Sequence, residues 1–85
     1  MPPHSHTAAV QRIYEQHHSW LHGWLKNRLS NACDAADVAH DTFVRILGAA
    51  NATQIREPRD YLATVARGLV IDRYRRRAIE LAYQQ

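Results

Sequence analysis

The stretch DAADVAHDTFVRIL, residues 34–47, decides the fold class of this 85-residue chain. Its small and apolar side chains recur at the three- and four-residue intervals of a helix that buries one side. They are Ala35, Val38, Ala39, Thr42, Phe43 and Ile46. Asp34 has the short acceptor side chain of an N-cap. Asp37, Asp41 and Arg45 follow one another at i, i+4 spacing on the opposite side, where Asp41 and Arg45 have the favourable order for a surface ion pair.

A helical pattern also precedes this stretch, beginning after Thr7, which is a candidate N-cap. Its apolar stripe consists of Val10, Ile13, Tyr14, His17, Trp20, Leu21, Trp24, Leu25 and Leu29. Ser19 or Gly23 could bend or divide the segment, so the sequence leaves open whether residues 8–29 form one helix or two. We expect residues 1–7 to be a disordered tail and residues 8–85 to be one domain.

The last helical pattern begins at Pro58, which suits the first position of a helix. Its buried stripe is predicted to be Leu62, Val65, Ala66 and Leu69. Between the second and third patterns, residues 48–57 read as a polar loop that is longer than most connections in a small helical domain, and such loops are often functional. The sequence therefore predicts an all-α fold, a compact bundle of three to four helices.

Charge is divided between two of these segments. Seven arginines occur between Arg56 and Arg77, whereas residues 34–41 hold three acids and no lysine or arginine. This division predicts two different partner surfaces. Cys33 is the only cysteine, which excludes an internal disulfide and suits a reducing compartment. No targeting signal and no membrane-length apolar run occurs, so we expect a cytoplasmic protein without membrane insertion.

The sequence contains few of the motifs that indicate an enzyme. No glycine-rich phosphate loop, nucleophile elbow or cysteine pair occurs. His18 and His22 could share a divalent metal at i, i+4 spacing, but a third ligand is lacking. Asp37 with His40 or Asp41 imitates an acid–base pair, yet a solvated acidic helix face is far commoner. We therefore predict no enzymatic activity, no metal and no cofactor.

The arginine-rich last helix indicates nucleic-acid binding more strongly. Arginine offers a fixed charge that matches phosphate geometry, and Tyr61 and Tyr74 interleave aromatic rings with those charges. Single-stranded nucleic acid is bound by this combination of cations and stacking surfaces. The alternative is a solvated basic helix end that complements its own dipole. Composition alone does not separate these two interpretations.

Three segments together resemble region 2 of the extracytoplasmic-function sigma factors of bacterial RNA polymerase. Residues 10–29 resemble region 2.1, residues 34–45 region 2.2, and residues 59–77 region 2.4. The similarity extends over about residues 8 to 82. The His17-His18-Ser19-Trp20-Leu21 stretch and Ile55-Arg56-Glu57-Pro58-Arg59 are most similar to the ferric-siderophore, or ferric-citrate, iron-uptake group.

The resemblance implies roles for particular residues. Asp37, His40, Asp41 and Arg45 would dock on the clamp helices of the RNA polymerase β′ subunit. The loop and last helix would recognise and melt the promoter −10 element, with one non-template base flipped into a pocket beneath the loop. The DNA-binding residues would then be Asn51, Thr53, Gln54, Tyr61, Arg67, Tyr74, Arg75 and Arg76.

The sequence departs from the family pattern at three positions. His40 replaces a common Gln, Tyr61 a common Trp and Gly68 a frequent Asn, which weakens any base-edge role at residue 68. The second helical domain that reads the −35 element in such factors is absent, so we expect an isolated domain. A second reading is a regulatory interaction module, because this domain in the family is held by a membrane-tethered anti-sigma regulator.

Overall fold

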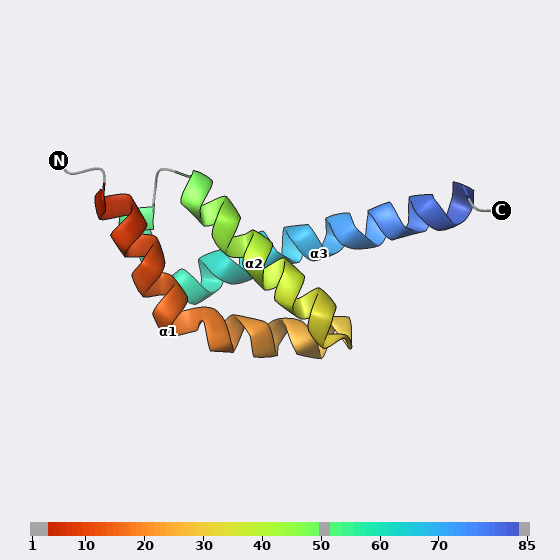
Figure 1. Ribbon diagram of the computed structural model, residues 1–85, viewed down its shortest axis with the longest axis horizontal. Helices are drawn as coiled ribbons and strands as arrows, with labels where there is room; N and C mark the ends of the chain where they lie inside the picture. Colours follow the sequence, from red (N-terminus) through yellow and green to blue (C-terminus); the bar gives the residue numbers. More distant parts are fainter. Residues whose placement is uncertain (1–3, 50–51, 84–85) are drawn as a thin grey trace.

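The computed structural model describes residues 4–49 and 52–83, which form three α-helices and one short 3-10 turn. Helix α1 spans His4–Leu29, α2 spans Ala32–Gly48 and α3 spans Pro58–Tyr83, while the 3-10 turn η1 covers Ala52–Gln54. The predicted all-α class with three helices is thereby confirmed, and no strand occurs within the described ranges. Figure 1 shows α1 and α2 lying together, with α3 crossing them and extending beyond both.

Helix α2 begins at a different cap from the one predicted. The Asn31 side chain accepts hydrogen bonds from the backbone N–H groups of Cys33 at 2.8 Å and Asp34 at 3.2 Å. The predicted N-cap, Asp34, is therefore wrong: Asn31 satisfies two otherwise free donors, and the helix starts two residues before Asp34. The Asp34 carboxylate instead lies in the first turn, where the helix dipole favours a negative charge.

Helix α1 starts earlier than the sequence predicted, at His4 rather than after Thr7. Residues 4–7 therefore belong to the helix and not to a tail. The His6 ring donates from Nε2 to the Leu47 carbonyl at 3.0 Å, which joins the start of α1 to the end of α2. Ala9 and Val10 are buried directly after it. This long-range contact gives the first turn of α1 a packing partner that its local sequence does not indicate.

Residues 8–29, for which the sequence left open one helix or two, belong to the single helix α1, and this helix bends near its middle (Figure 1). Neither Ser19 nor Gly23 interrupts it. His18, near the middle of α1, donates from Nδ1 to the Tyr14 carbonyl at 2.7 Å. A side chain that binds a helix carbonyl in this way competes with the backbone ladder, and such competition is a common cause of bending.

The core lies where the three helices meet. Leu21, Leu25 and Leu62 have no exposed surface, and Ile46 has only 1%. The expected face of α2 is confirmed at Ala35, Val38, Thr42, Phe43 and Ile46, which are buried, whereas Ala39 is only half-buried. In α3 the buried residues are Leu62, Ala66 and Val70. Val65 and Leu69, which were expected in that stripe, are only half-buried, and Val70 was missed.

The second half of α3 extends past the rest of the bundle. Val70 is its last buried residue, and beyond it every described side chain is exposed except the half-buried Arg73. The molecule therefore measures 54 × 22 × 18 Å, with the overhanging end of α3 at one extremity (Figure 1). We call residues 71–83 the α3 overhang. It carries Tyr74, Arg75 and Arg76, three of the residues predicted to bind DNA.

Ion pairs join the α3 overhang to the start of α2. Arg73 Nη1 lies 3.4 Å from Asp34 Oδ1, and Arg77 Nη2 lies 3.6 Å from Asp34 Oδ2. These are the ion pairs of the described residues, and the predicted pair between Asp41 and Arg45 is not among them. The Asp34 carboxylate, in the first turn of α2, therefore pairs with arginines on two successive turns of α3, the basic helix.

Candidate nucleic-acid interface

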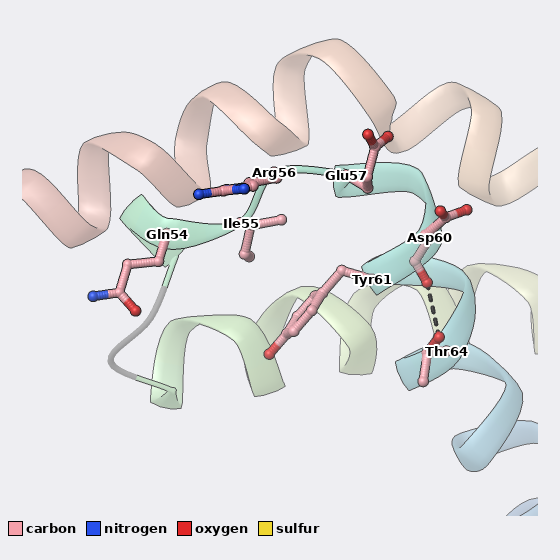
Figure 2. Close-up of a pocket in the computed structure, with 7 residues that line it drawn as sticks. All are labelled: Gln54, Ile55, Arg56, Glu57, Asp60, Tyr61 and Thr64. Atoms are coloured by element: carbon pink, nitrogen blue, oxygen red, sulfur yellow. Dashed lines mark hydrogen bonds between the residues drawn. The ribbon is translucent and has the colours of Figure 1, made fainter.

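An open hollow of about 460 Å³ lies between the segment 54–57 and the first two turns of α3 (Figure 2). Pro58 starts α3 directly after this segment, so the connection must turn back over the first helical residues. Ala52 in η1 is 4% exposed, which anchors the connection to the core. The residues that line the hollow are Gln54, Ile55, Arg56, Glu57, Asp60, Tyr61 and Thr64.

The hollow combines an apolar wall with hydrogen-bonding groups. Ile55 and Tyr61 are half-buried and pack against the core, and Figure 2 shows both on the inner side of the connection. The Thr64 hydroxyl donates to the backbone carbonyl of Asp60 at 2.9 Å. The side-chain carboxylate of Asp60 takes no part in this hydrogen bond. In such a site the planar ring can stack against a base, and the carboxylate and amide oxygens can accept hydrogen bonds from the amino group of that base.

Only some of the predicted loop residues come together in this hollow. Gln54 and Tyr61 both line it. Thr53 instead lines a neighbouring hollow against α1, beside Arg12 and Gln16. Asn51 lies outside the described residues. The sequence prediction missed Arg56 and the carboxylates next to Tyr61, although the arginine and acids around Pro58 were visible as a dense polar run.

The predicted DNA-binding residues of α3 fall into two groups. Arg67 is exposed on the bundle, with its guanidinium carbon 6.0 Å from the centroid of the Trp24 ring. Tyr74, Arg75 and Arg76 are exposed on the α3 overhang. At 1.5 Å per residue, Arg76 lies about 22 Å along the helix axis from Tyr61. The hollow and the overhang are therefore separate points of contact, and one small ligand would not reach both.

The outer face of α2 carries the second set of predicted residues. Asp37 and His40 are exposed there, and Asp41 is exposed at the edge of this face, where it shares a small hollow with Arg73 and Arg76 of α3. Val44 and Leu47, which follow His40 by four and seven residues, lie on the same side of the helix and are 50% and 49% exposed. The sequence prediction named the acids of this face and missed its two large apolar side chains.

Arg45 lies nearer to α3 than to that outer face. It shares small hollows with Asp72 and Leu69 of α3. Its exposed side chain therefore lies at the edge of the acidic face and beside the basic helix. Among the described residues, no three His, Cys, Asp or Glu side chains come together as a metal site, and no helix is long and apolar enough to cross a membrane.

Comparison with known proteins identifies the family. The model of sigma-70 region 2 matches residues 13–79, which run from the first half of α1 into the α3 overhang. The chain belongs to the sigma-70 region 2 family. The ferric citrate uptake sigma factor FecI of Escherichia coli (strain K12) is 42% identical over 73 residues, which cover 86% of this chain. No solved structure matches.

Membership of the sigma-70 region 2 family confirms the resemblance inferred from the three sequence segments. The similarity to FecI likewise agrees with the iron-uptake group suggested by the stretches at residues 17–21 and 55–59. This chain spans 42% of the length of FecI.

Proposed function

We propose that this chain is the domain of a sigma factor that docks on RNA polymerase and recognises and melts the promoter −10 element. By its similarity to the ferric citrate uptake sigma factor, the genes transcribed would be those of iron–siderophore uptake. The observation that carries the proposal is the family match over residues 13–79, which spans the outer face of α2, the hollow and the basic helix together. The role is one of binding, without catalysis, in the cytoplasm.

On the DNA side, the hollow would receive one flipped base of the non-template strand. Tyr61 would stack against it, and Gln54 with the neighbouring carboxylates would read its edge. Thr53, which lines the neighbouring hollow, would contact an adjacent nucleotide, and Asn51 is proposed as a DNA contact from the family resemblance alone. Unstacking a base costs a few kcal/mol, which these contacts can offset. Arg67, Tyr74, Arg75 and Arg76 would bind the strand mainly through its phosphates, since arginine matches that geometry.

On the polymerase side, the outer face of α2 would dock on the clamp helices of the β′ subunit. Asp37, His40 and Asp41 supply charge and hydrogen bonds around two exposed apolar side chains, Val44 and Leu47. An apolar centre with a polar rim is the usual composition of a protein interface. Arg45 would contact the partner from the edge of this face.

The DNA proposal is tested by competition between single-stranded non-template DNA and duplex of the same sequence. We expect the single strand to compete better. Gln54→Ala and Tyr61→Ala should relax base preference with little change in salt dependence, because base contacts specify and phosphate contacts position. Arg75→Ala and Arg76→Ala should each flatten the salt slope by roughly 0.7 without changing base preference. Equal competition by duplex would refute a melting role for this chain.

The docking proposal is tested by charge reversal on the outer face of α2. Asp37→Arg and Asp41→Arg should abolish retention of core polymerase in a pull-down. Their helical circular dichroism should stay unchanged, because exposed substitutions usually alter stability by no more than about 0.5 kcal/mol. Glu80→Arg, an exposed acid on the α3 overhang, is the matched control and should retain polymerase binding. Normal retention by both α2 variants would refute the assignment.

A second candidate function is a regulatory interaction module held by a membrane-tethered anti-sigma regulator. The observation that favours it is the set of large aliphatic side chains left exposed on α2 and α3, namely Val44, Leu47, Ile71, Ile79 and Leu81. Exposed apolar side chains of this size are commonly covered by a protein partner. If duplex DNA competes as well as single strand, this interpretation takes precedence over promoter melting.

A further inference from the structure

Two tryptophans and three arginines form a stacked array between α1 and α3. The rings of Trp20 and Trp24 stack, with centroids 6.2 Å apart and planes inclined by 29°. The guanidinium carbon of Arg28 lies 3.7 Å from the Trp24 centroid, and that of Arg67 lies 6.0 Å from it. The guanidinium carbon of Arg59 lies 5.1 Å from the Trp20 centroid. We call these five residues the tryptophan–arginine array.

The charges of this array have no carboxylate partner among the described residues, where the ion pairs join Asp34 to Arg73 and Arg77. Arg59 donates from Nε to His17 Nδ1 in a long hydrogen bond of 3.5 Å, which does not neutralise its charge. Arg28, Arg59 and Arg67 are all exposed. A guanidinium that lies over an indole keeps N–H groups free for a further acceptor while its rotamer is restrained. The array thus gathers three cations that have no carboxylate partner among the described residues.

The array adjoins the hollow described above. Arg59 immediately precedes Asp60, and Arg67 lies about 12 Å further along the axis of α3. Arg28 reaches the Trp24 ring from the last turn of α1. The three cations therefore lie where α1 and α3 contact each other, and Arg59 is one residue away from the lining of the hollow.

We propose that the tryptophan–arginine array binds the phosphates of single-stranded DNA next to the base held in the hollow. This inference rests on the proposed function and adds Arg28 and Arg59 to its binding residues. The rings of Trp20 and Trp24 are already covered by guanidinium groups, so the array contacts the backbone and does not read bases. Its contribution is therefore independent of DNA sequence. An acidic protein is the weaker candidate partner, because Arg59 directly precedes Asp60, which lines the hollow proposed to hold the base.

Trp20 and Trp24 are the only tryptophans of the chain, so intrinsic fluorescence reports directly on this array. The probe is a short oligodeoxythymidine titrated into the 85-residue chain. Overall binding is followed in parallel by the anisotropy of an end-labelled copy. We expect a saturable change in tryptophan emission with the same midpoint as the anisotropy.

Substitutions then test the phosphate contacts. Arg28→Gln and Arg59→Gln should each reduce the slope of log affinity against log salt by about 0.7. When the salt concentration is raised fourfold, the affinity of each variant should therefore fall about 2- to 3-fold less than that of the parent chain. Arg28→Lys keeps the charge and should keep the slope. Lys26→Gln is the matched control: Lys26 is exposed on α1, about 200° around the helix from Trp24, and its loss should leave the slope unchanged.

The outcomes separate this inference from the function on which it rests. Anisotropy that rises while tryptophan emission stays constant would overturn the array as a binding surface and leave the DNA-binding function standing. The same conclusion follows if Arg28→Gln and Arg59→Gln keep the parent slope. If no single-stranded DNA binds by either measure, the proposed function fails, and the array fails with it.

Discussion

Replacing Asp34 by asparagine should loosen the α3 overhang while leaving the bundle folded. The Asp34 carboxylate pairs with Arg73 at 3.4 Å and Arg77 at 3.6 Å, and these contacts lie beyond Val70, the last buried residue of α3. Asparagine keeps the shape of the side chain and removes its charge. The variant therefore tests the ion pairs without creating a cavity.

The magnitude follows from exposure and position. The Asp34 side chain is 20% exposed, that of Arg73 32% and that of Arg77 58%. Ion pairs near the surface contribute about 0.2–1 kcal/mol each, and the more exposed Arg77 pair belongs at the lower end of that range. A carboxylate in the first turn of a helix adds about 0.3–1 kcal/mol. We therefore expect Asp34→Asn to cost about 1 kcal/mol in free energy of unfolding.

A double-mutant cycle separates the ion pair from the helix dipole. Urea unfolding of the parent, Asp34→Asn, Arg73→Gln and the double variant should give a coupling of about 0.5 kcal/mol. The same cycle with Arg77→Gln should give a coupling near zero. Added salt should reduce the Arg73 coupling, and amide hydrogen exchange should rise in residues 73–83 of Asp34→Asn. Additive single effects and unchanged exchange would show that Asp34 does not hold the overhang.

Three further substitutions test the helix ends and the core. Leu62→Ala should lower the free energy of unfolding by about 2–5 kcal/mol in urea titrations, because Leu62 has no exposed surface; a cost under about 1 kcal/mol would contradict its central place. Asn31→Ala should cost about 1 kcal/mol through loss of the α2 N-cap, whereas Asn31→Asp should be nearly neutral. Ser30→Gly should raise the melting temperature and increase the free energy of unfolding by about 1 kcal/mol, since Ser30 has a φ of 56° that glycine adopts without strain. An unchanged or lower melting temperature would count against backbone strain at Ser30.

The parts of the fold that could be predicted are those with a local signal. The buried face of α2 follows from its spacing of apolar residues, and the start of α3 follows from Pro58. The cap of α2 could not be chosen in this way, because Asn31 and Asp34 are both good N-cap residues and stand three positions apart. The early start of α1 depends on His6 bonding Leu47, 41 residues away, and no local pattern encodes that contact.

The candidate site was predictable to a similar extent. Tyr61 and Gln54 were selected from the family resemblance, and they do line one hollow. Trp20 and Trp24 were expected only as part of an apolar stripe. Their association with Arg59 and Arg67 depends on the crossing of α1 over α3, which the periodicity of either helix alone does not specify.

The positions of the two proposed interfaces predict that they act independently. The acidic and apolar residues lie on the outer side of α2, whereas the tryptophan–arginine array lies between α1 and α3. Between them stands a core in which Leu21, Leu25 and Leu62 have no exposed surface, and close-packed interiors resist small displacements. Exposed charges more than about 10 Å apart are also largely screened at physiological salt. Asp37→Arg should therefore weaken polymerase binding without changing the salt slope for single-stranded DNA. Asp34 is an exception, because its ion pairs join α2 to α3, and a substitution there should disturb both surfaces. Asp41 and Arg45 share a small hollow with Arg73 and Arg76 of α3, so Asp37 is the better position at which to test independence.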